Sequence, residues 1–163
     1  QSVVPLVSTY NNLIVLRSMT KMYALAGVRL GYIISQQAPK FVESFPHWNV
    51  SEIAIQLGCA CIDAHDFVAE SRESSDIMRE SVEAFLKAHH CRVSNSAANF
   101  LLFSLPEQLD AQSFFMAMLE QGIVLRHTKN YVGLEGQWFR IGMKQTDAME
   151  RFKRAFTEYV QNY

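Results

Sequence analysis

The sequence predicts an α/β protein, in which a strand–turn–strand region is followed by helices and then by a small α+β domain. Three observations support this fold class. Short apolar runs flank a polar turn within residues 12–35, helical periodicity occupies residues 66–88, and strand-like and helix-like segments alternate from Cys91 onward. With 163 residues, 49% of them apolar and 19% charged, the chain has a globular composition and can form a sizeable core.

The segments before Cys91 are expected to form two strands and three helices. Residues 13–16 are an apolar run that indicates a buried strand, and residues 28–34 indicate a second one. Ser51 can cap a helix over residues 52–63, which is apolar nearly all round and is therefore expected to be buried. The other two helices are expected over residues 38–44 and 66–88.

The segments after Cys91 follow the order β-β-α-β-β-α. One helix should stop at Gly122, and the last should be capped by Thr146 or Asp147. The expected strands cover residues 92–93, 99–103, 123–126 and 137–143, and the first helix covers residues 110–121. The resulting domains are the end of a large domain (1–65), an interdomain helix (66–90) and a small α+β domain (91–163).

The polar turn after the first strand brings together groups suited to a phosphate and an aldehyde. Ser18 and Thr20 can each donate a hydrogen bond to a phosphate oxygen, and Arg29 can donate a planar fork of N–H groups. Lys21 supplies a nucleophilic amine. A phosphate-bearing carbonyl held in this way describes pyridoxal phosphate bound as a Schiff base. The residue types alone favour the other interpretation, a solvated turn that exposes Lys21 and Arg29.

Two arginines lie in the predicted strands of the small domain. Arg126 closes an apolar run, and Arg140 interrupts another that should be mostly buried. An arginine in such a strand needs an anionic partner, which is either a structural carboxylate or a ligand. The residue types leave these two alternatives open.

The pattern SxTKxYxLAGxRxGY over residues 18–32 closely resembles the lysine-site signature of class I/II aminotransferases, the fold-type I pyridoxal-phosphate enzymes. The resemblance implies that Lys21 binds pyridoxal 5'-phosphate covalently and that Ser18, Thr20 and Arg29 hold its phosphate. It also implies that the chain corresponds to the C-terminal part of such an enzyme, with the large-domain end before the small α+β domain, and that the enzyme is a homodimer.

Further matches to the same family concern substrate binding. The pattern FRIG over residues 139–142 is similar to the final strand whose arginine binds the substrate carboxylate, so the resemblance implies this role for Arg140. Arg126 in GIVLR resembles an arginine that contributes to substrate phosphate or carboxylate binding. Trp48-Asn49-Val50 matches a family pattern near the substrate, which makes Asn49 a substrate-binding candidate, whereas Ser51 departs from the usual Asn.

Within the family, the chain resembles the branch of histidinol-phosphate aminotransferases and threonine-phosphate decarboxylases. The stretch NYVGLEG over residues 130–136 is more similar to the decarboxylases. This resemblance implies decarboxylation of L-threonine O-3-phosphate, with a histidinol-phosphate-type aminotransferase or a non-catalytic ligand-sensing domain as alternatives. In each enzymatic case the partner is a small phosphorylated amino acid or amine.

Composition argues against several other classes. The net charge of −1 gives no support to nucleic-acid or anionic-membrane binding, and no apolar run approaches the length of a membrane-spanning helix. Cys59, Cys61 and Cys91 are expected to be free, buried thiols of a cytoplasmic protein. No metal site is expected, because the pairs Cys59/Cys61 and His89/His90 lack further ligands at metal spacing.

Overall fold

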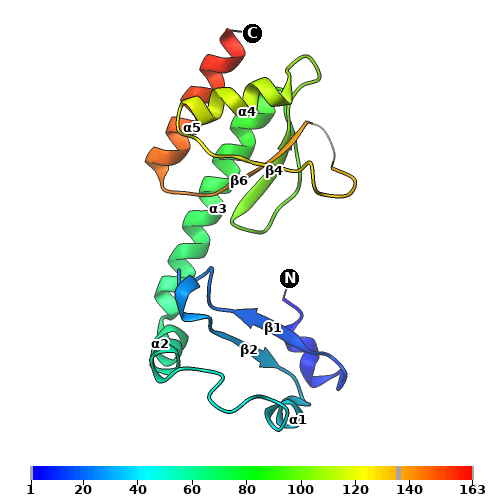
Figure 1. Cartoon of the computed structure of the whole chain (residues 1–163), viewed down its shortest axis with the longest axis vertical. Helices are drawn as coiled ribbons and strands as arrows, with labels where there is room; N and C mark the ends of the chain where they lie inside the picture. Colours follow the sequence, from blue (N-terminus) through cyan, green and yellow to red (C-terminus); the bar gives the residue numbers. More distant parts are fainter. Residues whose placement is uncertain (1, 135–136, 163) are drawn as a thin grey trace. The chain divides into compact units, whose positions relative to one another are not determined.

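The chain divides into two structural units. The computed structural model describes residues 2–134 and 137–162. One unit covers Gln1–Ser71 and the other covers Arg72–Tyr163 (Figure 1). The mixture of helices with a two-stranded and a four-stranded sheet confirms the α/β class predicted from the sequence.

The first unit is built on an antiparallel ribbon. Strand β1 (Val15–Ser18) pairs with β2 (Gly31–Ile34), and the short 3-10 helix η2 (Ala26–Val28) lies in their connection. The expected burial of the first strand is wrong, because Leu16 is 74% exposed. A strand buries only the side chains that another layer covers, and none of the described elements covers Leu16. Two short helices complete this part of the unit, η1 (Val4–Ser8) and α1 (Ala38–Val42).

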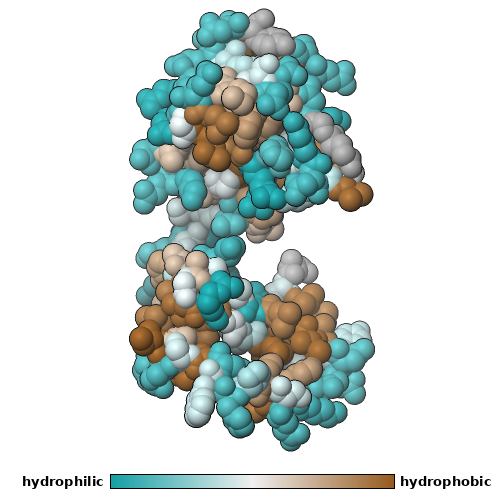
Figure 2. Space-filling model, in the orientation of Figure 1, coloured by the Kyte–Doolittle hydropathy of each residue, from teal (hydrophilic) through white to brown (hydrophobic). Residues whose placement is uncertain are grey.

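Helix α2 (Glu52–Asp63) begins at the predicted cap. The side chain of Ser51 accepts a hydrogen bond from the amide of Ala54, at 3.2 Å. The expected burial on all sides is wrong, because the helix buries only Ala54 and Gly58, whereas Ile53 is 72% exposed. Gly58 lies against the side chains of Leu30 and Met19, whereas the larger apolar residues of the helix stay exposed, so apolar surface remains over this unit (Figure 2).

The second unit contains a four-stranded antiparallel sheet, most of one long helix and two further helices. Helix α3 (His65–Ala88) leads into it from the first unit. The order of its strands and helices along the chain agrees with the predicted β-β-α-β-β-α pattern. The strands lie in the order β3 (Arg92–Val93), β4 (Phe100–Ser104), β6 (Trp138–Gly142), β5 (Arg126–His127), and the helices are α4 (Ala111–Glu120) and α5 (Thr146–Gln161).

One face of this sheet carries the core. Leu101 and Phe103 of β4 are fully buried, whereas Phe100 and Leu102, which point to the other face, are half-buried. The aromatic side chains of the core pack edge-to-face or tilted, with ring centroids 5.4–6.5 Å apart. These side chains are Phe103, Phe114, Phe139, Phe152 and Phe156. The opposite face is therefore available for polar groups.

Two expected boundaries in this unit are wrong. The strand expected over residues 123–126 is limited to Arg126–His127, because the amide of Ile123 donates to the carbonyl of Met118 (2.8 Å) and closes helix α4 after Gly122. The N-cap of the last helix is Gln145 rather than Thr146 or Asp147, and the side chain of Gln145 makes no capping hydrogen bond. Both boundaries depend on backbone hydrogen bonds that residue types do not reveal.

Candidate functional site

The polar turn lies at one end of the β1–β2 ribbon. Ser18 is the last residue of β1 and pairs with Gly31, and the amide of Met19 then donates to the carbonyl of Leu30 at 3.1 Å. Thr20 comes directly after Met19, and Arg29 comes directly before Leu30, so the two residues are next to the two ends of this hydrogen bond. The ribbon therefore brings the predicted phosphate-binding residues to the same end, on adjacent chain segments.

The side chains of this turn retain donors for an anion. The Ser18 hydroxyl accepts a hydrogen bond from the Thr20 amide (3.3 Å), so its own proton remains available. Lys21 is exposed and makes no side-chain hydrogen bond or ion pair with another described residue. Nη1 of Arg29 donates to the carbonyl of Ala26 (3.0 Å), and its remaining N–H groups can reach outward.

Two residues of the turn have left-handed backbone conformations. Ala24 has φ 54° and Arg29 has φ 58°, a region that non-glycine residues rarely adopt. In addition, the first acidic residue of the chain is Glu43, so no carboxylate within the turn compensates the charges of Lys21 and Arg29. A strained, uncompensated cationic turn with two hydroxyls fits a phosphate-bearing cofactor.

Arg126 and Arg140 are brought together in the second unit. They pair directly across β5 and β6. Arg126 begins strand β5, so the expectation that it ends a strand is wrong. None of the ion pairs among the described residues involves either arginine, and the four strands of the sheet contain no Asp or Glu. Of the two alternatives left open by the sequence, a structural carboxylate in the sheet is therefore absent, which favours a ligand.

Each of these guanidinium groups lies over an aromatic ring. The Cζ atom of Arg140 is 4.8 Å from the ring centroid of Phe100, and that of Arg126 is 5.7 Å from the ring centroid of Tyr131. Neither Phe100 nor Tyr131 was predicted to be a site residue. Phe100 could have been predicted only from its position on the same face of the sheet as Arg140. That position depends on the register of β4 and β6, which the sequence does not reveal.

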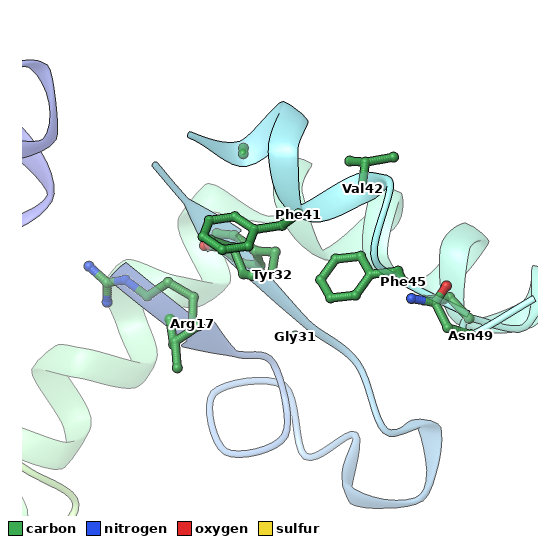
Figure 3. Close-up of a pocket in the computed structure, with 11 residues that line it drawn as sticks. Arg17, Gly31, Tyr32, Phe41, Val42, Phe45 and Asn49 are labelled. Carbon is green, nitrogen blue, oxygen red and sulfur yellow. The ribbon is translucent and has the colours of Figure 1, made fainter. Parts of the chain in front are cut away.

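Asn49 lies elsewhere in the first unit. It lines a depression of about 540 Å³ with Arg17, Tyr32, Phe41 and other largely apolar side chains (Figure 3). Arg17 and Asn49 lie at opposite ends of this depression in the view shown. None of Ser18, Thr20, Lys21 and Arg29 is among the lining residues. The structure therefore does not place Asn49 with the lysine turn.

The loop after β5 is held by a buried threonine. The hydroxyl of Thr128 lies 2.8 Å from the carbonyl of Leu134 and 3.1 Å from that of Trp138, and its own carbonyl accepts from the Tyr131 amide (2.8 Å). These bonds fix the described part of the NYVGLEG stretch, whose Glu135 and Gly136 lie outside the described residues. The ring of Tyr131 is thereby positioned next to Arg126.

Other kinds of site find little support in the described residues. They contain no group of three His, Cys, Asp or Glu side chains placed to hold a metal ion. No described helix is both long and apolar enough to cross a membrane. The three cysteines are free as expected, but only Cys91 is buried, since Cys59 is exposed and Cys61 half-buried.

A family model for aminotransferase class I and II matches residues 1–156. The chain belongs to the aminotransferase class I and II family. This membership confirms the resemblance of the lysine turn and, with it, pyridoxal 5'-phosphate as the cofactor expected from the sequence. The residues that would hold the cofactor in this chain remain a prediction, and so do the proposed domain boundaries.

Two histidinol-phosphate aminotransferases are similar to this chain, one compared by sequence and one by structure. A histidinol-phosphate aminotransferase of Nitratidesulfovibrio vulgaris is 33% identical over 156 residues, which are 93% of this chain and 40% of that protein. The structure of the Clostridium acetobutylicum histidinol-phosphate aminotransferase superposes with a TM-score of 0.90 at 27% identity, covering 99% of this chain and 50% of that one.

A decarboxylase from Sulfurospirillum multivorans is similar as well, with a TM-score of 0.83 at 26% identity, over 97% of this chain and 42% of that one. The chain thus spans half or less of the length of these relatives.

Proposed function

We propose that this chain contributes the cofactor-binding lysine and the substrate-binding arginines of a pyridoxal-phosphate enzyme that acts on a phosphorylated amino acid or amine. The observation that carries this proposal is the convergence of Ser18, Thr20, Lys21 and Arg29 at one end of the β1–β2 ribbon. When bound, the cofactor supplies an electron sink for the reaction. A homodimer is part of the proposal, by analogy with the family.

Each residue of the turn has a separate role in this proposal. Ser18 and Thr20 donate hydrogen bonds to the cofactor phosphate, and Arg29 adds charge-assisted ones. Lys21 would hold the cofactor through its amine and, when the amino group of the substrate takes its place, would be free to carry a proton to or from the substrate. Its exposed position at the turn allows the side chain to serve in both steps.

The arginine pair of the second unit is suited to the anionic groups of the substrate. Arg126 and Arg140 stand opposite each other with no acidic partner in the sheet. A guanidinium can bind a carboxylate or a phosphate through two parallel hydrogen bonds. The orientation in which these arginines hold the anionic groups of the substrate would determine which bond at its α-carbon is broken.

Transamination is the first candidate reaction. It is favoured by the names of similar proteins, since the relative at 33% identity and the structure at TM-score 0.90 are both histidinol-phosphate aminotransferases. The decarboxylation ranked first from the loop sequence is not confirmed by these comparisons. In the transamination proposal, Arg140 binds an anionic group of the substrate, and Lys21 carries the proton that leaves the α-carbon.

Decarboxylation is the second candidate reaction, and the loop after β5 and one similar structure support it. The loop with Asn130, Tyr131, Gly133 and Leu134 is fixed by Thr128 and places Tyr131 over Arg126. The similarity to a Sulfurospirillum multivorans decarboxylase supports the same candidate. In that case the arginines would orient the substrate so that its carboxylate is the group that is lost.

Product analysis separates the two reactions. The protein as the cell makes it is loaded with pyridoxal phosphate and incubated with histidinol phosphate plus 2-oxoglutarate, or with threonine phosphate. Glutamate formation supports transamination, and carbon dioxide release supports decarboxylation. A visible absorbance band that borohydride reduces, without turnover of either substrate, would contradict the enzymatic proposal and favour a ligand-sensing domain.

A further inference from the structure

We infer that Phe100 and Tyr131 are positioning residues, which hold the guanidinium groups of Arg140 and Arg126 in place for an anionic ligand without neutralising their charge. This inference rests on the proposed function, because it concerns the same arginines. It adds two aromatic side chains that do not themselves bind the substrate. It also explains how two adjacent arginines are kept in place on a sheet that contains no acid.

The contact between Phe100 and Arg140 follows from the sheet register. Leu102 of β4 pairs with Arg140 of β6, and Phe100, two residues earlier, pairs with Gly142. Phe100 is therefore the diagonal neighbour of Arg140 on the face opposite the core, within reach of a long side chain. The guanidinium of Arg140 lies over this ring, with Cζ 4.8 Å from the ring centroid of Phe100.

The contact between Tyr131 and Arg126 depends on the buried hydroxyl of Thr128. Thr128 is fully buried, and its bonds fix the loop that contains Tyr131. The ring centroid of Tyr131 lies 5.7 Å from Cζ of Arg126. Two different elements, a strand and a hydrogen-bonded loop, thus place a ring beneath each of the two paired arginines.

An aromatic ring holds an arginine in a way that a carboxylate cannot. A carboxylate occupies the N–H groups of the guanidinium and cancels its charge. A ring attracts the face of the guanidinium and leaves its N–H edge free to donate to a ligand. Such support is needed here, because Arg126 and Arg140 are like charges directly opposite each other, a pairing that is unfavourable in a sheet.

A third arginine of the sheet provides a matched comparison. Cζ of Arg92 lies 5.5 Å from the ring centroid of Trp138, and Nε of Arg92 also donates to the hydroxyl of Ser104 at 3.2 Å. Arg92 is on β3, which is the edge strand opposite to the edge strand β5 that contains Arg126. It has the same kind of ring contact but is not one of the proposed substrate ligands.

The test compares ring removal at these positions in the protein as the cell makes it, loaded with pyridoxal phosphate. Phe100→Leu and Tyr131→Leu are expected to raise the KM for histidinol phosphate or threonine phosphate, whichever the wild type converts, about three- to tenfold. The kcat and the cofactor absorbance spectrum should stay close to wild type. Phe100→Tyr and Tyr131→Phe, which keep a ring, should restore the wild-type KM.

The control variant Trp138→Leu removes a ring from Arg92 and should leave the KM unchanged. The inference is overturned if Phe100→Leu and Tyr131→Leu have the wild-type KM while Arg140→Gln raises it strongly. If Arg140→Gln also has the wild-type KM, the proposed function of the arginine pair fails instead. Thermal unfolding of each variant shows whether the assays are made on folded protein, and variants that unfold early are assayed at a lower temperature.

Discussion

The amide of Met19 donates a hydrogen bond to the carbonyl of Leu30 over 3.1 Å, one position beyond the Ser18–Gly31 pair that ends the two strands. This bond extends the β1–β2 ribbon into the polar turn. Met19 is only 4% exposed, so its side chain anchors the turn from the other side. A turn held by both its backbone and an apolar side chain can present Ser18 and Arg29 without large rearrangement, which lowers the cost of binding an anion.

Substitution of Gly31 by alanine is expected to destabilise this arrangement. A Cβ at this position would lie 2.7 Å from the backbone carbonyl oxygen of Arg17. Backbone atoms of a paired strand cannot move aside as a side chain can, so the ribbon must shift. We expect Gly31→Ala to lower the free energy of unfolding by about 1–3 kcal/mol, measured by urea denaturation. Weaker binding of pyridoxal phosphate should accompany the loss, because Ser18 pairs with Gly31.

Gly27→Ala is the matched control for this substitution. Nothing lies within 4 Å of a Cβ built at Gly27, and its backbone is not left-handed. Its stability should therefore remain close to that of the wild type. Equal losses in both variants would show that the close approach to Arg17 is not the cause.

Lys21 is expected to be the residue that borohydride links to the cofactor. Reduction of the protein with bound pyridoxal phosphate, followed by proteolysis and mass spectrometry, should find the modification on the peptide that contains Lys21. Lys21→Arg keeps the positive charge but removes the primary amine, so it should abolish both the modification and the turnover. Modification of a different lysine in the wild type would refute the assignment of the turn.

The cap of helix α4 predicts a pH dependence of stability. The carboxylate of Asp110 accepts a hydrogen bond from the amide of Ser113 at 2.6 Å, and this bond lowers the pKa of Asp110 below its usual value. A lowered pKa in the folded state stabilises the fold above the ordinary carboxyl pKa, and this contribution is lost as the pH falls through the folded-state pKa. The unfolding midpoint in urea should therefore decrease as the pH falls below the ordinary carboxyl pKa of about 4.

Asp110→Asn separates this ionisation from capping itself. Asparagine can still accept a hydrogen bond at an N-cap, so the stability at neutral pH should change little. The variant should lose part of the acid dependence seen in the wild type. An unchanged pH profile would indicate that other carboxylates determine it.

The cysteines should differ in reactivity. Cys91 is buried, and burial raises the pKa of its thiol to about 12. Because the thiolate is the reactive form, a thiol reagent near neutral pH should modify Cys91 only after unfolding. Cys59 is exposed and should be modified in the folded protein. Mass spectrometry after a short exposure, with Cys59→Ser as the control, measures this order. Rapid modification of Cys91 would mean that the second unit opens under native conditions.

Features governed by neighbouring residues were determined by the sequence itself. The Ser51 cap, the span of α2 and the stop of α4 before Gly122 depend on local hydrogen bonds and backbone conformation, and the structure agrees with each prediction. The motif around Lys21 likewise predicted the family, because its residues are fixed within a single turn. Local signals of this kind do not require knowledge of what packs against them.

Features that depend on contacts between distant segments were decided only by the tertiary structure. The register of β5 and β6 could not be predicted from the sequence, and neither could the pairing of Arg126 with Arg140 or the position of the Phe100 ring beneath Arg140. The sequence also predicted burial for all apolar sides of α2, although only the small residues Ala54 and Gly58 are buried. Burial and strand register are set by which surfaces meet, and the free energy of those contacts belongs to pairs of segments rather than to either segment alone.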